Sequence, residues 1–406
     1  MDLNTFNLKR NIVLVNKTAI ILLLFNLLLS CEYQKEYKNI TSSRSLHFKN
    51  TKSFSETKWD SLNHISNEKT IHKKGKLNSK YKTFGWHLYS NGSSYKNYNF
   101  EMLWGISYFS YVVKPETGGY KSIHQWKTTA LIDSAKAHNC NVFLSVSNFG
   151  RKNNSAFLNN TKSQETLINN LIDLLAYRKA NGINIDFEGI ARKDSKQLTS
   201  FVSLISKRLK KENPNYMVSL CLYANDWNNV FNIKKLNPFI DFYTLMGYDY
   251  YGSFSSYAGP VTPLKNSKKF GNGLESSISN YLKKGVKAQK LIVGLPYYGA
   301  EWYTSNEKTP SKVKKFKSHP AYKTIKRIYI DSLKIPLQFD IESASTYLSF
   351  KDDKAYKEIW FEDSKSLAIK YDWIKKNNIG GVGIWALGYD DGYPELWNLL
   401  ADKFSE

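Results

Sequence analysis

The chain has 406 residues, of which 42% are hydrophobic and 15% aromatic, enough for a large core and for one large α/β unit with additions. Its net charge of +23 could indicate a nucleic-acid partner, but the lysines are spread along the chain and no basic recognition helix or nucleic-acid motif occurs. We therefore assign the charge to a solvated surface and expect no nucleic-acid partner. The seven histidines lack metal-ligand spacing, so we expect neither a metal nor another cofactor.

The N-terminus has the pattern of an export signal. An apolar run from Ala19 to Ser30 follows Lys9, Arg10 and Lys17, and it is shorter than the ~20 apolar residues of a membrane span. Residues 28–31, Leu-Leu-Ser-Cys, resemble a bacterial lipobox, which implies cleavage of a signal peptide (residues 1–30) and a lipid on Cys31. The polar residues 31–81 then read as a flexible tether. We expect an exported protein anchored in a membrane of the bacterial cell envelope.

From residue 82 to 406, strand and helix patterns alternate. Eight short apolar runs are candidate strands, at residues 84–89, 103–111, 142–146, 183–187, 217–222, 242–246, 291–295 and 382–385. Five segments between or after them have helical spacing of apolar residues, at 122–138, 166–178, 197–211, 274–284 and 364–376. Alternating strands and helices imply parallel strand pairing.

Eight strand–helix units predict a (β/α)8 TIM barrel. A doubly wound open sheet is the alternative, and the absence of a Gly-rich phosphate loop after the first strand weakens it. The interval between the seventh and eighth strands, about residues 300–362, is long. It contains three short strand patterns (335–341, 346–350 and 356–361) and a helical one near 319–328. We predict a small α+β insertion at the barrel mouth, and a monomer.

Residues 181–188, Asn-Gly-Ile-Asn-Ile-Asp-Phe-Glu, carry most of the chemical information. Ile183, Ile185 and Phe187 alternate with Asn184, Asp186 and Glu188, so a strand would place the three polar side chains on one face. Two carboxyl groups on one face repel each other, which raises one pKa and favours a general acid. Sites that cleave sugars need such carboxyl groups at fixed geometry. Glu188, nearer the strand end, is the better candidate for the acid.

Other strand ends should converge on the same mouth, because active sites of such barrels lie at the carboxyl ends of the strands. The sixth strand ends in Met-Gly-Tyr-Asp at residues 246–249, which adds a phenol and a third carboxylate. An indole at the end of the eighth strand could form the floor under a sugar ring. The candidate site residues at these ends are Ser145, Asn148, Tyr248, Asp249, Tyr297 and Trp385.

These motifs together resemble glycoside hydrolase family 18. Residues 181–188 resemble its signature Asp-Gly-x-Asp-x-Asp-x-Glu, residues 246–249 its Met-x-Tyr-Asp motif, and Trp385 its tryptophan on the eighth strand. The resemblance covers about residues 82–403. Asn-Ile-Asp-Phe-Glu, Ser147-Asn148 and Trp-Phe-Glu-Asp-Ser at residues 360–364 are closest to the spore-cortex and cell-wall branch, whose members cleave after N-acetylglucosamine in peptidoglycan; others with this pattern are chitinases.

The resemblance implies substrate-assisted retaining hydrolysis of β-1,4 linkages in an N-acetylglucosamine polysaccharide. Glu188 would protonate the leaving oxygen, and the 2-acetamido oxygen of the substrate would attack the anomeric carbon. Asp186 would orient the acetamido group, Tyr248 would bind its carbonyl, and Asp249 would contact the same sugar. The resemblance leaves open whether the polymer is chitin or peptidoglycan. It also leaves open whether cleavage is internal or terminal. A non-catalytic carbohydrate-binding barrel is the alternative function.

The sequence departs from the family signature at two positions. Asn181 and Asn184 stand where aspartates are usual. The aspartate matching Asn184 exchanges a proton or hydrogen bond with the residue matching Asp186. We expect Asn184 to take part in the substrate site and to be able to bond Asp186, although an amide cannot take a proton.

Overall fold

The computed structural model describes residues 54–63, 65, 69–352 and 355–406. The predicted signal peptide and the lipid attachment residue Cys31 therefore lie outside the described residues. Eight parallel strands pair in the order β1-β14-β8-β7-β6-β5-β4-β2, and β2 pairs with β1 to close the ring. This is the predicted (β/α)8 barrel. Its strands are β1 (Lys82–Leu88), β2 (Gly105–Val113), β4 (Asn141–Phe149), β5 (Gly182–Glu188), β6 (Met217–Tyr223), β7 (Phe242–Met246), β8 (Leu291–Pro296) and β14 (Gly381–Trp385).

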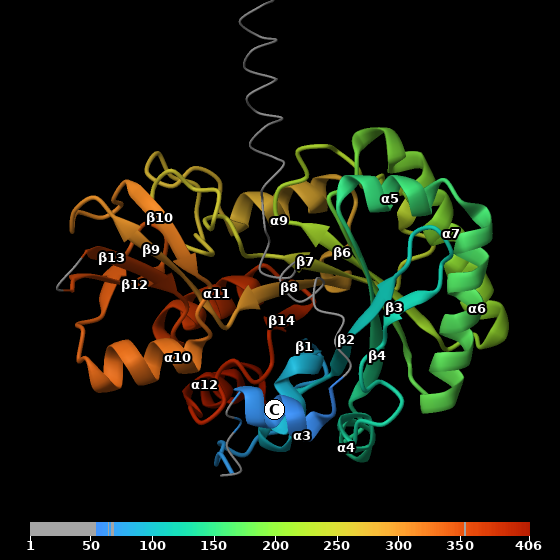
Figure 1. Ribbon diagram of the computed structural model, residues 1–406, viewed down its shortest axis with the longest axis horizontal. Helices are drawn as coiled ribbons and strands as arrows, with labels where there is room; N and C mark the ends of the chain where they lie inside the picture. Colours follow the sequence, from blue (N-terminus) through green and yellow to red (C-terminus); the bar gives the residue numbers. More distant parts are fainter. Residues whose placement is uncertain (1–53, 64, 66–68, 353–354) are drawn as a thin grey trace, which may run out of the picture. The chain divides into compact units, whose positions relative to one another are not determined.

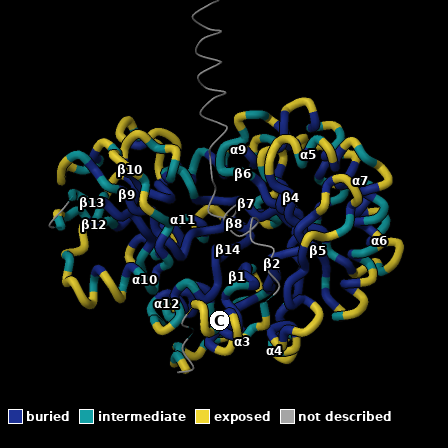
Figure 2. Tube along the Cα trace, in the orientation of Figure 1, coloured by how far each residue is buried: buried dark blue, intermediate teal, exposed yellow. Residues whose placement is uncertain are grey.

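Helices surround the strands, and their apolar faces are buried while their outer faces are exposed (Figures 1 and 2). Three begin at side-chain caps: Asn160 accepts from the Ser163 amide, Asn232 accepts from the Lys235 amide, and Asp363 forms a capping box with Ser366. In the part of the chain that the structure describes, no helix combines the length and the hydropathy needed to cross a bilayer. The helices of this layer are α4 (Leu131–Ala137), α5 (Arg151–Leu158), α6 (Thr161–Arg178), α7 (Ser195–Glu212), α8 (Ile233–Leu236), α9 (Leu274–Lys283), α11 (Ser364–Lys376) and α12 (Glu395–Phe404).

The helix predicted at residues 122–138 is wrong over its first half. Residues 120–122 form β3 (Tyr120–Ser122), which pairs antiparallel with β2, and α4 begins only at Leu131. His124 has a positive φ of 47°, which interrupts a helical path. Trp126 is buried, and its indole N–H donates to the Leu174 carbonyl on α6 at 3.2 Å. The apolar spacing in this segment therefore reflects packing of turns.

The segment before the barrel is packed over more of its length than a tether would be. Helix α3 (Glu56–Asn63) buries Trp59 against Tyr89, with ring centroids 5.3 Å apart. The Asp60 carboxylate accepts from the Ser93 amide at 2.7 Å, so α3 is tied to the 3-10 helix η2 (Tyr89–Asn97) that follows β1. The tether predicted for residues 31–81 thus does not describe residues 56–63, because Trp59 supplies a buried apolar contact.

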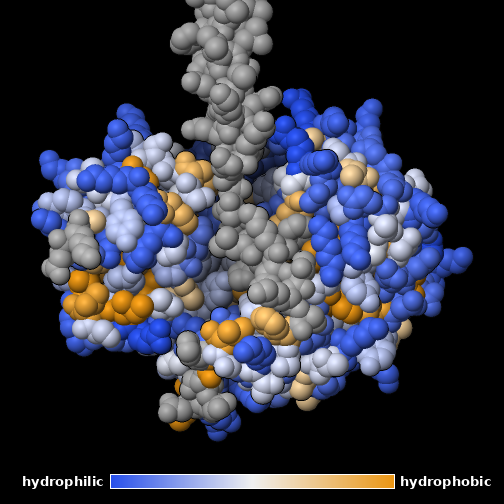
Figure 3. Space-filling view, in the orientation of Figure 1, coloured by the Kyte–Doolittle hydropathy of each residue, from blue (hydrophilic) through white to orange (hydrophobic). Residues whose placement is uncertain are grey.

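An antiparallel sheet of five strands and a short helical segment lie between β8 and β14, beside the barrel (Figure 1). Apolar surface gathers near its helical end in Figure 3. The exposed large apolar residues between 326 and 341 are Ile328, Leu333, Leu337 and Ile341. The strand order is β10-β9-β13-β12-β11. The elements are β9 (Gly299–Thr304), β10 (Val313–Ser318), α10 (Tyr322–Ile325), a π-helical turn η6 (Lys326–Ser332), β11 (Gln338–Asp340), β12 (Ser345–Lys351) and β13 (Tyr356–Phe361). We call residues 299–361 the insertion.

Glu358 is a buried carboxyl group inside the insertion. Its two oxygens accept from the indole N–H of Trp360 at 2.6 Å and from the Ser311 amide at 3.2 Å. Burial raises its pKa to about 7, although both hydrogen bonds oppose the shift. The folded protein therefore holds this proton at pH values where the unfolded chain, with a pKa near 4.5, has released it.

This shift predicts a pH dependence of stability. Because the folded state binds the proton more tightly, the contribution of Glu358 is most favourable at low pH and is lost as the pH rises from about 4.5 to about 7. The loss amounts to about 3 kcal/mol in total, of which about three quarters falls between pH 5 and pH 8. We expect Glu358→Gln to show a smaller fall in unfolding free energy over that range than wild type, measured by urea denaturation. The exposed Glu307→Gln is the control, and equal falls in wild type and Glu358→Gln would contradict the assignment.

Candidate active site

Asp186 and Glu188 lie on the inward face of β5. Ile183, Ile185 and Phe187 belong to the core between barrel and helices, so alternation directs the two acids to the barrel interior. Asp186 is buried and Glu188, at the end of the strand, is half-buried. The protein therefore carries one carboxyl group deep in the barrel and a second above it at the mouth, where a leaving oxygen can be reached.

Neighbouring strands supply hydroxyl groups around these acids. Ser147 on β4 is in register with Asp186, and its Oγ lies 2.6 Å from the Ser110 Oγ on β2. Tyr223 at the end of β6 donates to the Phe187 carbonyl at 2.8 Å. Burial raises the pKa of Tyr223 well above its usual value, and the nearby Glu188 adds to the shift. The Tyr223 hydroxyl thus stays protonated and braces the strand that carries both acids.

The Met-Gly-Tyr-Asp motif and Trp385 meet at the mouth. The Tyr248 ring stacks on the Trp385 indole, with centroids 6.4 Å apart and planes at 23°. Trp385 is also packed edge-on against Trp86 and Phe109. Asp249, which has a positive φ of 57°, accepts a hydrogen bond from the Tyr298 hydroxyl. An aromatic wall and a third carboxylate therefore adjoin the end of β7.

Three residues predicted to bind substrate, Ser145, Asn148 and Tyr297, do not lie beside the two acids at the barrel mouth. Ser145 is in register with Asn184 below the acids, and its Oγ bonds the Ser107 Oγ at 2.7 Å. Asn148 alternates with Ser147 and so shares the helix-facing side of β4 with Val146.

Tyr297 points away from the mouth as well. Its hydroxyl lies 3.2 Å from that of Tyr371 on α11, in the layer between barrel and helices. The next residue, Tyr298, is the one that reaches Asp249. We did not select Tyr298 from the sequence, because Leu291–Leu295 is apolar on both faces and its pattern does not reveal which side is inward.

Asn184 lies in the barrel interior and is held by residues of three other strands. Its Oδ1 accepts from the Trp86 indole N–H at 2.8 Å and from the Cys221 thiol at 3.3 Å. Its Nδ2 donates to Ser219 Oγ at 2.8 Å and to Thr244 Oγ1 at 3.4 Å. These four contacts occupy the carbonyl oxygen and both N–H groups of the amide. They fix the orientation of Asn184 among the side chains of β1, β6 and β7.

The hydroxyl partners explain why residue 184 is an amide. Ser219 donates its single proton to the Ile183 carbonyl at 3.1 Å, and Thr244 donates its own to the Cys221 sulfur at 3.2 Å. With their protons so placed, both hydroxyls can only accept from residue 184, and an amide supplies a proton to each. Asn181 has the opposite requirement, because its Oδ1 accepts from the Val142 amide at 2.8 Å.

This difference predicts opposite outcomes for two similar substitutions. Asn184→Asp should lower the unfolding free energy by roughly 1–3 kcal/mol, because a buried carboxylate would face two acceptors. Asn181→Asp should be tolerated within about 0.5 kcal/mol, because a carboxylate can accept the same amide. Denaturant unfolding at pH 7 measures both. Equal stability of the two variants would contradict the proton arrangement described for Asn184.

Comparison with known proteins identifies the family. The sequence pattern of the glycosyl hydrolases family 18 matches residues 78–390, a range that contains both motifs and Trp385. The chain belongs to this family. It is a glycoside hydrolase, and the matched range includes the two carboxylates of β5. Among the described residues, no group of three or more His, Cys, Asp or Glu side chains is arranged to hold a metal ion.

Two relatives of this glycosidase are proteins of Bacillus species. The uncharacterised glycosylase YvbX of Bacillus subtilis (strain 168) is 28% identical over 261 residues, which cover 61% of this chain and 68% of YvbX. The cortical fragment-lytic enzyme of Bacillus anthracis is 25% identical over 272 residues, which cover 64% of this chain and 57% of that enzyme. The chain therefore spans little more than half the length of the cortical enzyme.

Solved structures share the fold of this glycosidase. A family 18 chitinase from Cycas revoluta in complex with (GlcNAc)3 has a TM-score of 0.70 at 18% identity, covering 79% of this chain and 99% of the other. A family 18 N-acetylglucosaminidase from Paenibacillus barengoltzii has a TM-score of 0.69 at 17% identity, with the same coverage. Because both identities are below 25%, the likeness to these two structures shows a shared fold only.

Proposed function

We propose that this glycosidase hydrolyses β-1,4 linkages after N-acetylglucosamine by substrate-assisted retention. The observation that carries the proposal is the pair on β5: a half-buried Glu188 at the mouth above a buried Asp186. Such a pair offers a single acid/base with access to the scissile bond, and the acetamido group of the substrate supplies the nucleophile that a second accessible carboxylate would otherwise provide.

In this mechanism each residue has a defined role. Glu188 donates its proton to the leaving oxygen as the acetamido oxygen bonds to the anomeric carbon, and it then accepts a proton from the attacking water. Asp186 holds the acetamido N–H and offsets the positive charge of the cyclic intermediate. The Tyr248 hydroxyl bonds the acetamido carbonyl. Asp249 contacts the same sugar, and the Tyr298 hydroxyl fixes its carboxylate.

The name of the solved chitinase supports chitin as one candidate polymer, and the resemblance of residues 184–188 and 360–364 to the spore-cortex and cell-wall branch supports peptidoglycan as the other. Incubating the full chain with chitooligosaccharides and with purified peptidoglycan, and measuring new reducing ends, separates them. Retention predicts that the first product seen by NMR is the β-anomer, and the need for an acetamido group predicts no cleavage of fully deacetylated chitosan. Binding of both polymers without any new reducing ends would favour the non-catalytic alternative.

We also propose that the enzyme acts at the cell envelope through a lipid anchor on Cys31. The basis is the apolar run ending in Leu-Leu-Ser-Cys at residues 28–31. Feeding bacteria that express the chain with a radioactive fatty acid should label wild type and leave Cys31→Ala unlabelled. Labelling of Cys31→Ala would exclude this residue as the attachment point.

A further inference from the structure

The residues that carry Tyr248 are connected to the insertion by a continuous chain of buried hydrogen bonds. We propose that Thr262 is a positioning residue, through which the insertion and α11 hold Tyr248 and Asp249 in their working places. The proposal rests on the proposed function, because it assigns a purpose to the placement of these two residues.

The inner end of this chain is the backbone next to Tyr248. Thr262 Oγ1 donates to the Gly247 carbonyl at 2.8 Å, and the Gly247 amide donates to the Gly294 carbonyl on β8 at 3.0 Å. A side chain at Gly247 would meet that carbonyl at 2.7 Å, so the backbone is packed directly on β8. Gly247 is thus held from two sides, and one of the two holds is the Thr262 hydroxyl.

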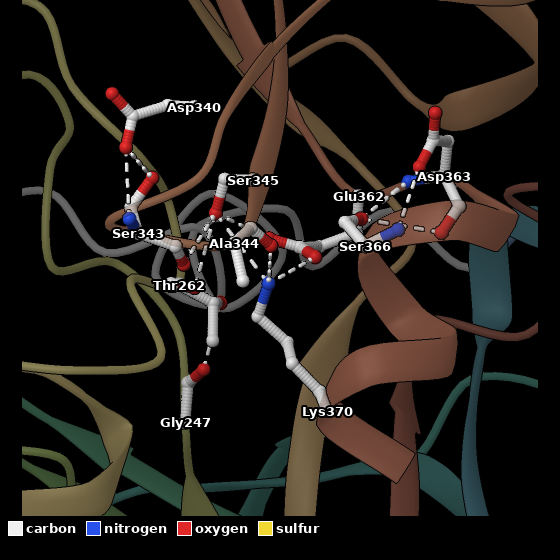
Figure 4. A network of polar contacts seen from close by, with 10 residues as sticks. All are labelled: Gly247, Thr262, Asp340, Ser343, Ala344, Ser345, Glu362, Asp363, Ser366 and Lys370. Atoms are coloured by element: carbon white, nitrogen blue, oxygen red, sulfur yellow. Dashed lines mark hydrogen bonds and ion pairs between the residues drawn. The ribbon is translucent and has the colours of Figure 1, made fainter. Parts of the chain in front are cut away.

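The outer end of the chain is the buried ion pair of Lys370 on α11 and Glu362, shown in Figure 4. Lys370 Nζ contacts Glu362 Oε2 at 2.6 Å and the Ala344 carbonyl at 2.7 Å. Lys370 Nζ also donates to Ser345 Oγ at 3.4 Å, and the Ser345 hydroxyl can donate its one proton to the Thr262 carbonyl at 3.3 Å. Ser345, the first residue of β12, therefore joins the ion pair to Thr262.

The rest of the loop after β7 is attached to the insertion as well. The Leu264 amide donates to the Ser343 carbonyl at 2.9 Å, and the Ala258 amide donates to the Ser311 carbonyl at 2.9 Å. The Trp302 indole N–H on β9 donates to the Gly252 carbonyl at 3.1 Å. A loop held at these separate points cannot move independently of the insertion.

Asp249 is attached to the insertion by a second route. Tyr298, whose hydroxyl donates to Asp249, immediately precedes β9, the first strand of the insertion. The backbone before Tyr248 and the side chain of Asp249 thus both depend on residues at the base of the insertion. Small displacements of catalytic groups reduce rate strongly, about 10²-fold for 1 Å in favourable cases, so this attachment has a kinetic consequence.

Thr262→Val tests the proposal, since it keeps the branched shape and removes the donor to Gly247. We expect kcat on a chitooligosaccharide or peptidoglycan fragment to fall about tenfold, with KM changed less than about threefold. Thr262→Ser, which keeps the hydroxyl, should restore kcat to within about threefold of wild type. Ser345→Ala removes the donor to the Thr262 carbonyl and should give a smaller fall in kcat; it decides the question if Thr262→Val does not fold.

Thr346→Val is the matched control, because Thr346 is a buried threonine beside Ser345 whose hydroxyl has no partner among the described residues. Its kcat should equal that of wild type. A wild-type kcat in Thr262→Val, or an equal loss in Thr262→Ser, would overturn the inference while leaving the proposed function standing. A wild-type protein without turnover on either polymer would overturn the proposed function and the inference together.

Discussion

Glu188→Gln is expected to lower kcat by about 10²- to 10⁴-fold, because it removes the only proposed proton donor to the leaving oxygen. The glutamine has nearly the same shape and Glu188 is half-buried at the end of β5, so the fold and the affinity for substrate should change little. Initial rates of reducing-end release, with substrate binding measured by calorimetry, separate the two effects.

The control for this substitution is Glu212→Gln, which makes the same change at an exposed glutamate at the end of α7. Its kcat should match that of wild type. If Glu188→Gln retained turnover within a few-fold of wild type, the general acid would have to be another residue. A loss of both turnover and cooperative unfolding would mean that Glu188 serves the fold.

Breaking the Lys370–Glu362 ion pair is expected to have the largest effect on stability. Both side chains are 0% exposed, and their charged atoms are 2.6 Å apart. Burial raises the pKa of Glu362 and lowers that of Lys370, while each charge opposes the shift of the other. Lys370→Met leaves a buried carboxylate without its cation, so the unfolding free energy should fall by about 3–5 kcal/mol at pH 8.

A pH comparison and a double variant make this prediction specific. In Lys370→Met the stranded Glu362 can take up a proton, so the destabilisation should be smaller at pH 5 than at pH 8. Lys370→Met combined with Glu362→Leu removes both charges and should be more stable than Lys370→Met at pH 8, because a matched apolar pair avoids the stranded charge. Additive losses in the double variant would show that the pair is not coupled.

Several features of the site follow from local sequence patterns. The alternation of Ile183, Ile185 and Phe187 with polar residues assigns Asp186 and Glu188 to one face, and the structure places that face inward. The alternation of strand and helix patterns predicts the barrel, whose closure the structure confirms. Both succeed because periodicity within one segment reports which face of that segment is buried.

Other features depend on contacts between distant segments. The choice between Tyr297 and Tyr298 is not readable from β8, whose residues are apolar on both faces. From the sequence we expect Asn184 to take part in the substrate site and to bond Asp186, whereas in the structure its amide bonds Trp86, Ser219 and Thr244. Its protonation requirement is set by the donors and acceptors around it.

The sequence by itself determined the family, the barrel and the two acids of β5, because each is encoded in a short pattern of alternating or spaced residues. Only the tertiary structure decided how those acids are surrounded and what holds Tyr248. Thr262, Ser345 and Lys370 are far apart in the chain and meet in space, where one hydroxyl or ammonium group has a defined partner. Such hydrogen bonds depend on positions in three dimensions, which the local order of residues does not specify.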